Sequence, residues 1–334
     1  MIIESSAPTR ADLAGGTIDI WPLYLFHPGA MTVNFALSLR AHVRIETRAY
    51  DRLILESRDR EICFETTLDR IEELARDHQL ELVSKMVHFF RPEVGFHLIA
   101  HSEAPAGAGI AGSSALAIAL IGGLNSLVGN RYDRGQFIGI ATNVETTVIK
   151  VPAGFQDYYP AFYGSTSCIH FRADGIEREH LAVDDDEIKR RFVICYTGEP
   201  RLSGINNWDS FKRHIDGDAE LFTIFERIRE AAGQMRAALL ANDWNAVAET
   251  MRAAYPNRKR LAPTITTPQM DHLVERALAN GAEAAKVCGA GGGGCIAFLC
   301  AAGRKPEVER TLGEEGAEIL RWEVARDGLK VSES

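Results

Sequence analysis

The stretch that decides the fold reads Pro105-Ala-Gly-Ala-Gly-Ile-Ala-Gly-Ser-Ser-Ala-Leu116. A strand-like run, residues 96–101, precedes it, and residues 115–124 form an apolar run typical of a buried helix. Its glycines allow the backbone to turn tightly and approach a ligand, and its two serines favour a helix start. Because a helix N-terminus presents free N–H groups and the positive end of a dipole, this order predicts an anion site, most naturally for phosphate.

Two nucleotide-binding motifs fit this stretch in part. The spacing of Gly107 and Gly112 matches a P-loop, but Ser113 stands where that motif needs a lysine to reach the phosphates. Gly107-x-Gly-x-x-Gly112 also matches the dinucleotide fingerprint, which needs an acidic residue at a strand end about 20 positions later. Residues 129–133 lie there and read as a polar turn. A dinucleotide-dependent oxidoreductase and a turn without a ligand therefore stay open as alternatives.

Composition narrows the class of protein. With 334 residues the chain can form two domains, and its net charge of −9 makes a nucleic-acid partner unexpected. None of its six cysteines forms a Cys-x-x-Cys pair, so we expect reduced core residues in a reducing compartment and no zinc site. The first residues lack the features of a signal peptide, and no apolar stretch approaches about 18 residues. We therefore expect a cytoplasmic protein without a membrane partner.

The order of elements changes along the chain. Strand patterns prevail in the first half and helical patterns in the second, with a highly charged segment at residues 174–191 between them. We place a domain boundary near there, and a solvated surface hairpin, which would look the same, stays open as the alternative. Strands are expected at 1–6, 29–39, 41–47, 53–64 (a hairpin), 96–101, 167–171, 192–196, 285–288, 295–300 and 317–324, and helices at 68–90 (in two pieces around 77–79), 115–124, 133–147, 218–241, 244–255, 267–280 and 308–315.

Two further glycine-bearing segments flank the central one. Residues 7–19, Ala-Pro-Thr-Arg-Ala-Asp-Leu-Ala-Gly-Gly-Thr-Ile-Asp, put an arginine and two aspartates into a turn-rich loop that can pack polar groups against a small ligand. Taken alone, this segment could equally be a solvated β-turn. Residues 286–295, Lys-Val-Cys-Gly-Ala-Gly-Gly-Gly-Gly-Cys, form the third segment.

In this order the three segments, residues 7–19, 105–115 and 286–295, resemble the motifs of the GHMP kinases. That family phosphorylates sugars and other small alcohols, including galactose, homoserine, mevalonate and phosphomevalonate. The resemblance implies an α+β fold of two domains with the active site between them. Residues 1–185 would form a ribosomal-S5-like, ATP-binding domain, and residues 186–334 a ferredoxin-like domain.

The first segment also resembles one branch of the family. Galactokinases usually carry a glutamate at the position of Gly16 and a histidine at that of Thr17. The form found here, followed by Trp21-Pro22 and Gly29-Ala30-x-x-x-Asn34, is more similar to the mannoheptose-phosphate and fucose kinases. Residues 258–261, Arg-Lys-Arg-Leu, and residues 265–271 point to the same branch.

The resemblance implies ATP and Mg²⁺ as cofactors. Backbone N–H groups of the central loop would bind the phosphates, while Ser114 and Glu145 would hold the metal, which prefers few protein oxygens beside phosphate and water. For Glu145 the alternative is a surface acid on a helix. The implied nucleotide-binding residues are Pro105, Gly107, Ala108, Gly109, Ile110, Ala111, Gly112, Ser113 and Ser114.

The resemblance places the catalytic aspartate at Asp157, within a Gly/Pro loop, and Arg10 beside it. Asp157 would either remove the proton of the substrate hydroxyl or only orient that hydroxyl, and both roles stay open. Arg10 would stabilise the charge that develops on the alkoxide and the phosphoryl group. The implied substrate-binding residues are Asp19, Gly15, Gly16, Gly291, Gly292 and Arg201.

These residues predict an ATP-dependent kinase of a sugar or sugar phosphate. Arg201 or the cluster of residues 258–260 could bind a phosphate already on the substrate, although that cluster could also be a solvated helix face. A heptose 7-phosphate is the first candidate and a free sugar such as fucose the second. A mevalonate-type kinase or decarboxylase and a catalytically inactive sugar-binding regulator are alternatives, and homodimer formation stays open. The joint presence of Arg10, Ser114, Glu145 and Asp157 argues against an inactive protein.

Overall fold

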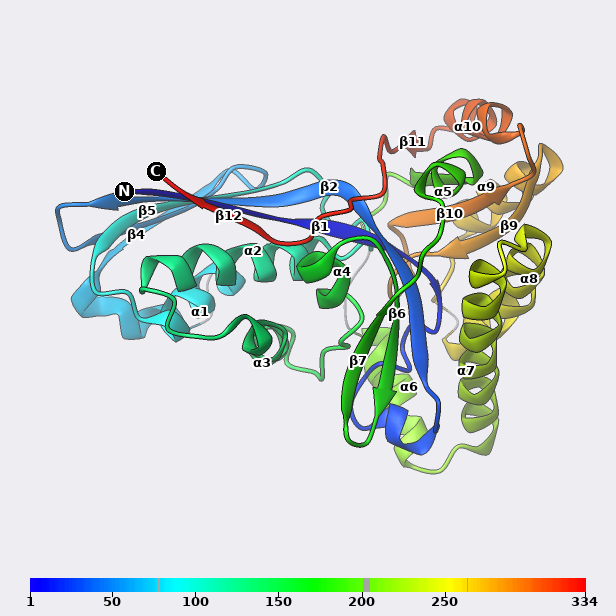
Figure 1. Cartoon of the computed structure of the whole chain (residues 1–334), viewed down its shortest axis with the longest axis horizontal. Coiled ribbons are helices and arrows are strands. Elements are labelled where there is room, and N and C mark those ends of the chain that lie inside the picture. The colour runs from blue at the N-terminus through cyan, green and yellow to red at the C-terminus, as the bar shows by residue number, and fades with distance from the viewer. Residues whose placement is uncertain (77–78, 201–204, 263) are drawn as a thin grey trace.

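The computed structural model describes residues 1–76, 79–200, 205–262 and 264–334, which form two sheets with helices packed on them (Figure 1). The larger sheet has the strand order β12-β1-β2-β5-β3-β4, and β6 and β7 extend it beside β2. Its strands are β1 (Ile2–Ala14), β2 (Met31–Arg48), β3 (Arg52–Ser57), β4 (Ile62–Thr67), β5 (Gly95–Ser102), β6 (Thr166–Arg172), β7 (Gly175–His180) and β12 (Lys330–Glu333).

Strand β2 holds this sheet together. Its residues 31–35 pair with β6, its residues 41–48 pair with β5, and β1 runs antiparallel beside it. The register of β1 shifts between Pro8 and Thr9 and again between Asp12 and Ala14, as at β-bulges, which re-aim side chains. The second half of β1 is buried on both faces, so its charged residues lie inside the protein.

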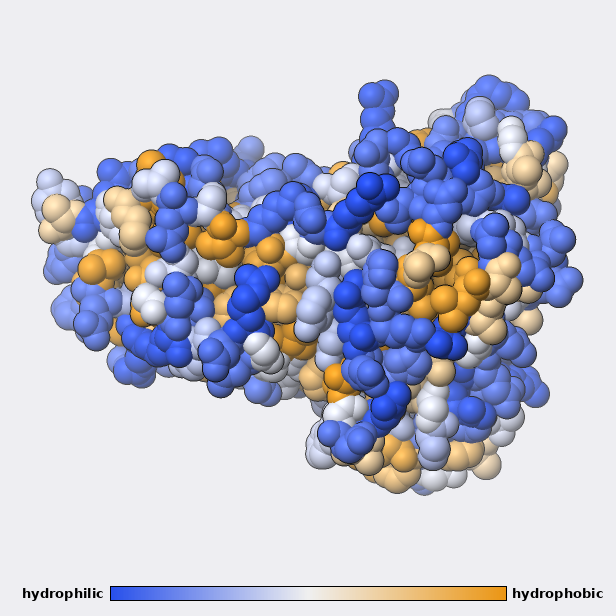
Figure 2. Space-filling model, in the orientation of Figure 1, coloured by the Kyte–Doolittle hydropathy of each residue, from blue (hydrophilic) through white to orange (hydrophobic). Residues whose placement is uncertain are grey.

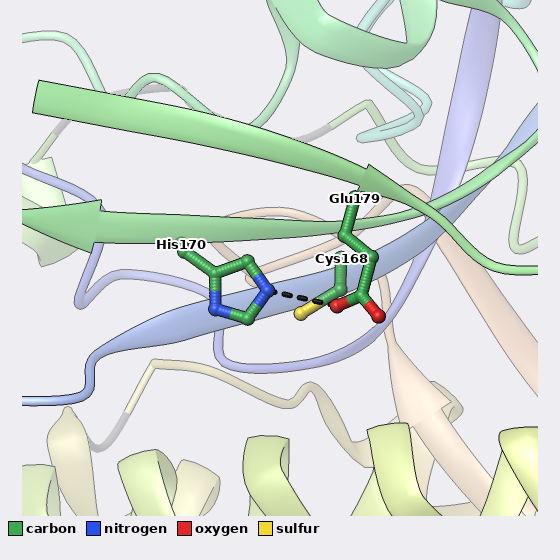
Figure 3. A group of neighbouring side chains, drawn as sticks. All are labelled: Cys168, His170 and Glu179. Carbon is green, nitrogen blue, oxygen red and sulfur yellow. Dashed lines mark hydrogen bonds and ion pairs between the residues drawn. The ribbon is translucent and has the colours of Figure 1, made fainter.

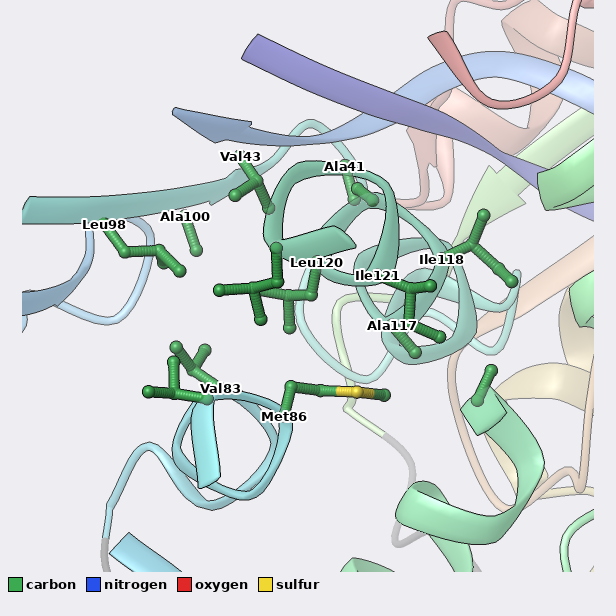
Figure 4. Packing of buried hydrophobic residues seen from close by; sticks show 14 of the residues in the cluster. Ala41, Val43, Val83, Met86, Leu98, Ala100, Ala117, Ile118, Leu120 and Ile121 are labelled. Carbon is green, nitrogen blue, oxygen red and sulfur yellow. The ribbon is translucent and has the colours of Figure 1, made fainter. Parts of the chain in front are cut away.

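Helices cover one face of the larger sheet (Figure 1). The apolar helix α2 packs on β1 and β2, and its Leu120 and Ile121 lie among Val43, Leu98 and Met86 in the core shown in Figure 4. Because both the sheet and other helices surround α2, it is apolar on most sides. The helical segments of this half are η1 (Leu23–Phe26), η2 (Leu68–Ala75), α1 (Glu81–Phe90), α2 (Gly112–Leu127), η3 (Arg134–Gln136), α3 (Phe137–Ile149) and α4 (Tyr158–Tyr163).

The second sheet is fully antiparallel, with the order β11-β8-β10-β9. Numbered along the chain this order is 4-1-3-2, the arrangement of the ferredoxin-like fold, so this part of the predicted architecture is confirmed. Its strands are β8 (Phe192–Tyr196), β9 (Ala282–Val287), β10 (Cys295–Cys300) and β11 (Glu318–Ile319). Its helices are α5 (Asp185–Arg191), α6 (Ile205–Ile215), α7 (Ala219–Leu240), α8 (Trp244–Leu261), α9 (Pro268–Ala279) and α10 (Lys305–Glu314).

Several element boundaries differ from the predictions. The two helical pieces expected within 68–90 are confirmed as η2 and α1, the first of them a 3-10 helix, whereas the two strands expected at 29–47 are the single strand β2. The strand expected at 317–324 is reduced to β11, whereas β12 was not predicted at all. Because β12 pairs with β1, the two chain ends lie side by side in the larger sheet (Figure 1). The division at residue 185 stays a prediction. Strand β12 comes from the second half of the chain but belongs to the larger sheet, which the first half builds.

The surface is mostly polar. Hydrophilic residues cover most of the face in Figure 2, with smaller hydrophobic areas between them. Among the helices of the described residues, none is both long and apolar enough to cross a membrane.

Candidate active site

A cavity of about 350 Å³ is lined by residues of both halves of the chain. Its walls are the end of the loop after β5, the first turn of α2, the loop at residues 151–157, and part of the third glycine segment. It gathers most of the residues that the sequence singled out, namely Arg10, Asp19, Pro105, Gly107, Ala108, Gly109, Ala111, Gly112, Ser113, Ser114, Glu145 and Asp157.

The central glycine loop ends in a helix start at the cavity wall. Gly107 and Gly109 have φ of 70° and 76°, and Ala111, with φ of 65°, is the N-cap of α2. The amide of Ala115 is the first in this helix to bond to Ala111, so the N–H groups before it have no acceptor within the helix. Such a turn can bind a phosphate, as the sequence predicts.

One member of the predicted loop set does not face the cavity. Ile110 is fully buried, and its carbonyl accepts a hydrogen bond of 3.0 Å from the backbone N–H of Arg10. The carbonyl of Gly109 accepts a second bond of 3.0 Å, from Nη1 of Arg10. Ile110 therefore ties the loop to β1, and the expectation that it lines the nucleotide site is not met by its side chain.

Three hydroxyl groups converge on Glu145. Ser113 donates to Oε1 at 2.6 Å, while Ser114 and Tyr158 donate to Oε2 at 3.3 and 2.6 Å. Burial raises the pKa of Glu145, and the bonds from these hydroxyls, which favour the ionised form, oppose this only in part. The side chain is therefore no surface acid. A carboxylate and a serine hydroxyl beside a loop that can bind phosphate suit Mg²⁺, which prefers few protein oxygens. The contact with Ser113 was not predicted.

Arg10 and Asp157 form a partly buried ion pair at the cavity. Nε and Nη2 of Arg10 lie 2.8 and 2.6 Å from Oδ1 of Asp157. Arg10 is 1% exposed and Asp157 is 22% exposed, so the carboxylate is the member that a substrate can reach. Burial acts to lower the pKa of Arg10, but Asp157 and Asp12 outweigh it and hold that pKa above its ordinary value. The guanidinium is therefore a fixed positive charge.

Asp19 is a second carboxylate at the cavity, but unlike Asp157 it is buried and has no ion pair with Arg10 among the contacts described. The backbone N–H of Gln156 donates to its Oδ2 at 3.0 Å. A Cβ on Gly154 would lie 2.2 Å from the same oxygen, so residue 154 must be glycine for Asp19 to fit. Burial raises the pKa of Asp19 to about 6 against the effect of the bond from Gln156. Asp19 is thus an acceptor with few competing partners at the cavity wall.

The glycines of the first segment pack against protein instead of lining this cavity. A Cβ on Gly15, which has φ of 85°, would lie 2.0 Å from the carbonyl oxygen of Met31, and one on Gly16 would lie 3.1 Å from Oδ2 of Asp12. Both glycines line a separate cavity of about 30 Å³. Their predicted direct contact with the substrate is therefore not supported by their position.

The third segment packs on the central loop. The amide of Cys295 donates to the carbonyl of Ala108 at 2.7 Å, and a Cβ on Gly294 would lie 2.6 Å from that oxygen. Gly291 and Gly292, predicted to contact substrate, face Ile265 instead, whose carbonyl accepts the amide of Gly292 at 3.0 Å. Gly289 and Ala290 are the members that line the cavity. Arg201 lies outside the described residues.

Arg258 is a cavity residue that the sequence did not single out within its cluster. Its Nη2 donates to the carbonyl of Gly289 at 2.6 Å, and its Nη1 donates to the hydroxyl of Thr17. Its neighbours face outward, since Lys259 pairs with Asp271 and Arg260 with Glu220 on the surface. Arg258 is buried, so the expectation of a solvated face holds for two residues of the cluster and fails for the third.

A separate cluster of potential metal ligands lies on β6 and β7 (Figure 3). Ligand atoms of Cys168, His170 and Glu179 lie within 4.8 Å of one another. Both oxygens of Glu179, however, accept hydrogen bonds of 2.6 Å from Arg236. Burial also raises the pKa of Cys168 to about 12. With a thiol and a neutralised carboxylate, the cluster holds α7 to the sheet and gives a cation little attraction.

Comparisons with known proteins agree with this geometry. Residues 81–165 match the GHMP kinases N terminal domain and residues 235–318 match the GHMP kinases C terminal domain, together about half of the chain. The D-glycero-alpha-D-manno-heptose 7-phosphate kinase of Campylobacter jejuni is 23% identical over 98% of both chains. The mevalonate kinase of Pyrococcus furiosus is 24% identical over 100% of this chain and 99% of its own.

Two solved structures show the same fold along nearly the whole chain. The D-glycero-D-manno-heptose 1-phosphate kinase of Bacteroides thetaiotaomicron is 21% identical, with a TM-score of 0.77 over 99% of each chain. The galactokinase of Lactococcus lactis is 18% identical, with a TM-score of 0.79 over 98% of this chain and 95% of its own. At these identities the likeness shows the fold alone. With both of its domains matched and its architecture shared, the chain belongs to the GHMP kinase family.

Proposed function

We propose that the protein transfers the γ-phosphoryl group of ATP to a hydroxyl of a sugar or sugar phosphate, with a heptose 7-phosphate as the first candidate. Family membership supports a phosphotransferase. The observation that carries the proposal is the contact of Arg10 with Asp157 in the same cavity as the phosphate-binding helix start. Phosphoryl transfer needs an oriented hydroxyl, a phosphate cradle and a means to neutralise charge, and the cavity has candidates for all three.

ATP and Mg²⁺ fit the residues of the central loop and of the first turn of α2 in this cavity. The N–H groups at the start of α2 would bind the phosphates, while Ser114 and Glu145 would hold the metal, which neutralises phosphate charge when bound. The bonds of Ser113 and Tyr158 to Glu145 would keep its carboxylate directed at Ser114.

In the same cavity, Asp157 would receive the substrate hydroxyl. Its carboxylate would accept the hydrogen bond of that hydroxyl and either take its proton or orient it for attack. Arg10, already in contact with Asp157, would stabilise the negative charge that develops between the attacking oxygen and the phosphoryl group. Because Arg10 is fixed by a carbonyl and two carboxylates, it needs little reorganisation during the reaction.

Two cavity residues support an acceptor that is both hydroxylated and anionic. The carboxylate of Asp19 suits hydroxyl groups, and the guanidinium of Arg258 suits a phosphate or a carboxylate. The heptose 7-phosphate kinase among the relatives favours a sugar phosphate. Mevalonate, which carries a carboxylate, replaces a free sugar as the second candidate here, because mevalonate kinases match this chain at similar identity over its full length.

An acceptor panel tests the proposal. Purified protein would be assayed for ADP release with ATP and Mg²⁺, against heptose phosphates, fucose and other free sugars, and mevalonate, with the product identified by mass spectrometry. We expect ADP release that depends on the acceptor and is fastest with a sugar phosphate. Release with mevalonate alone would select the second candidate. If the protein binds NAD(P) but not ATP and releases no ADP with any acceptor, the kinase proposal is rejected and an oxidoreductase is favoured.

A further inference from the structure

A line of alternating charges runs behind the proposed catalytic pair. Nζ of Lys286 lies 2.5 Å from Oδ2 of Asp12, and Oδ1 of Asp12 lies 3.4 Å from Nη1 of Arg10. The same guanidinium contacts Asp157 through Nε and Nη2. Three of these four side chains are nearly inaccessible, with exposures of 12% for Lys286 and 1% each for Asp12 and Arg10.

This line joins the two sheets. Lys286 stands on β9 of the second sheet, whereas Asp12 and Arg10 stand on β1 of the larger one. The backbone N–H of Gly289, from the third glycine segment, also donates to Oδ1 of Asp12 at 3.3 Å. Neither Lys286 nor Asp12 is among the residues that line the main cavity, so we assign neither of them a direct contact with the substrate.

Lys286 influences which carboxylate, Asp12 or Asp157, attracts the guanidinium of Arg10 more strongly. A buried carboxylate without a partner is unfavourable, so Asp12 needs a nearby cation. Burial acts to raise the pKa of Asp12, but Lys286 and then Arg10 outweigh it and hold that pKa well below its ordinary value. Arg258 on α8 adds a weaker attraction. Without Lys286, Arg10 would become the main cation for Asp12, and its guanidinium would be drawn away from Asp157.

We propose that Lys286 and Asp12 are positioning residues, which hold Arg10 in contact with Asp157. The geometry of the catalytic pair then depends on how the second sheet packs against the larger one. This inference rests on the proposed function, because that function gives Arg10 and Asp157 their roles. It adds that an ion pair between the halves sets the geometry of a group that acts on the substrate.

The first test compares Lys286→Met with a matched control. Displacing Arg10 by about 1 Å should lower kcat by about 10²-fold, with the KM for ATP within about threefold of wild type. Lys286→Arg, which keeps the charge, should retain most of the activity. The control is Lys305→Met, since Lys305 is 20% exposed in the same half and pairs with Glu309 away from the cavity. It should leave kcat unchanged.

A double variant separates charge balance from simple loss of a contact. In Asp12→Asn/Lys286→Met no buried charge is left unpaired, so kcat should recover at least about tenfold over Lys286→Met. The proposal is overturned by a kcat of Lys286→Met near wild type, by parallel losses in kcat and ATP affinity, or by a double variant no better than the single one. If Lys286→Met does not fold, the variants Asp12→Asn and Lys286→Arg are compared instead, with kcat and the KM for ATP as the readouts.

An additional measurement does not depend on turnover. In protein labelled with ¹⁵N-arginine, the Nε–H signal of Arg10, assigned with Arg10→Lys, should be sharp and slow to exchange in wild type. It should broaden or exchange faster in Lys286→Met and be restored in Lys286→Arg. An unchanged signal in Lys286→Met would overturn the positioning role. A wild-type protein without turnover on any acceptor would reject the proposed function instead, and this signal would still decide the question of positioning.

Discussion

Replacing Asp19 by asparagine should stabilise the free protein while it lowers activity. Burial raises the pKa of this carboxyl from 3.8, its ordinary value, to about 6 in the folded protein. The folded chain therefore holds the proton at pH values where the unfolded chain has already lost it. Stability falls as the pH rises through this range, and above pH 6 the full destabilisation is present. Asparagine carries no charge and so avoids this cost.

The size of the effect follows from the two pKa values. At about 1.4 kcal/mol per pKa unit, the substitution should stabilise by about 3 kcal/mol near pH 8 and by only about 0.5 kcal/mol near pH 4. With an unfolding entropy of about 2.1 cal/mol/K per residue, these values correspond to about 4 °C and less than about 1 °C in Tm. The side-chain oxygen of asparagine can still accept the N–H of Gln156, so that bond should be kept.

Calorimetry of both proteins between pH 4 and pH 8 is the assay, and Asp12→Asn is the matched control. Asp12 is also a buried aspartate and lies on β1, but Lys286 and Arg10 lower its pKa, so its loss should destabilise the protein at neutral pH. Asp19→Asn should also lower kcat/KM for the acceptor by about tenfold or more, as expected when a buried hydrogen bond to a charged group is lost. A Tm at pH 8 below that of wild type would refute the assignment of Asp19 as a desolvated carboxylate.

Three further predictions concern the cavity. Asp157→Asn should lower kcat by on the order of 10²-fold with ATP affinity nearly unchanged, and near-normal turnover would remove Asp157 from the mechanism. Ser114→Ala and Glu145→Gln should both weaken activity in a way that added Mg²⁺ partly rescues, and metal titrations like that of wild type would contradict a shared ion. Arg258→Ala should raise the KM for a phosphorylated sugar about tenfold or more but change that for a free sugar little, and equal effects on both would refute a phosphate contact.

Features that depend on local chemistry could be predicted from the sequence. The central stretch was expected to run from a strand through a glycine loop into a helix, and β5, the loop and α2 follow in this order. Gly107 and Gly109 adopt positive φ angles that glycine permits, and the serines stand in the first turn, where their hydroxyls reach Glu145. These preferences act over a few residues, so a single sequence contains them.

The sequence could not predict which distant parts of the chain would contact a given side chain or glycine. Glycine indicates a close approach, but the sequence does not tell whether a ligand or the backbone approaches, and at Gly15 and Gly291 it is the backbone of Met31 and Ile265. Among three consecutive basic residues only Arg258 faces the cavity, because the rotation of α8 on the sheet selects it. That rotation depends on tertiary packing, which the pattern of charges does not contain.

The two aspartates of the first segment show how the second half of the chain assigns roles to the first. Both are buried on or just beyond β1, yet Lys286 of β9 keeps Asp12 ionised, whereas Asp19 lies against Gly154 and the backbone of Gln156 and holds its proton more tightly. A buried carboxylate with a cation partner has little to gain from a substrate hydroxyl. One that lacks such a partner gains a great deal from it. Asp12 lies next to the second sheet and therefore orders Arg10, whereas Asp19 lies away from Lys286 and stays available to an acceptor.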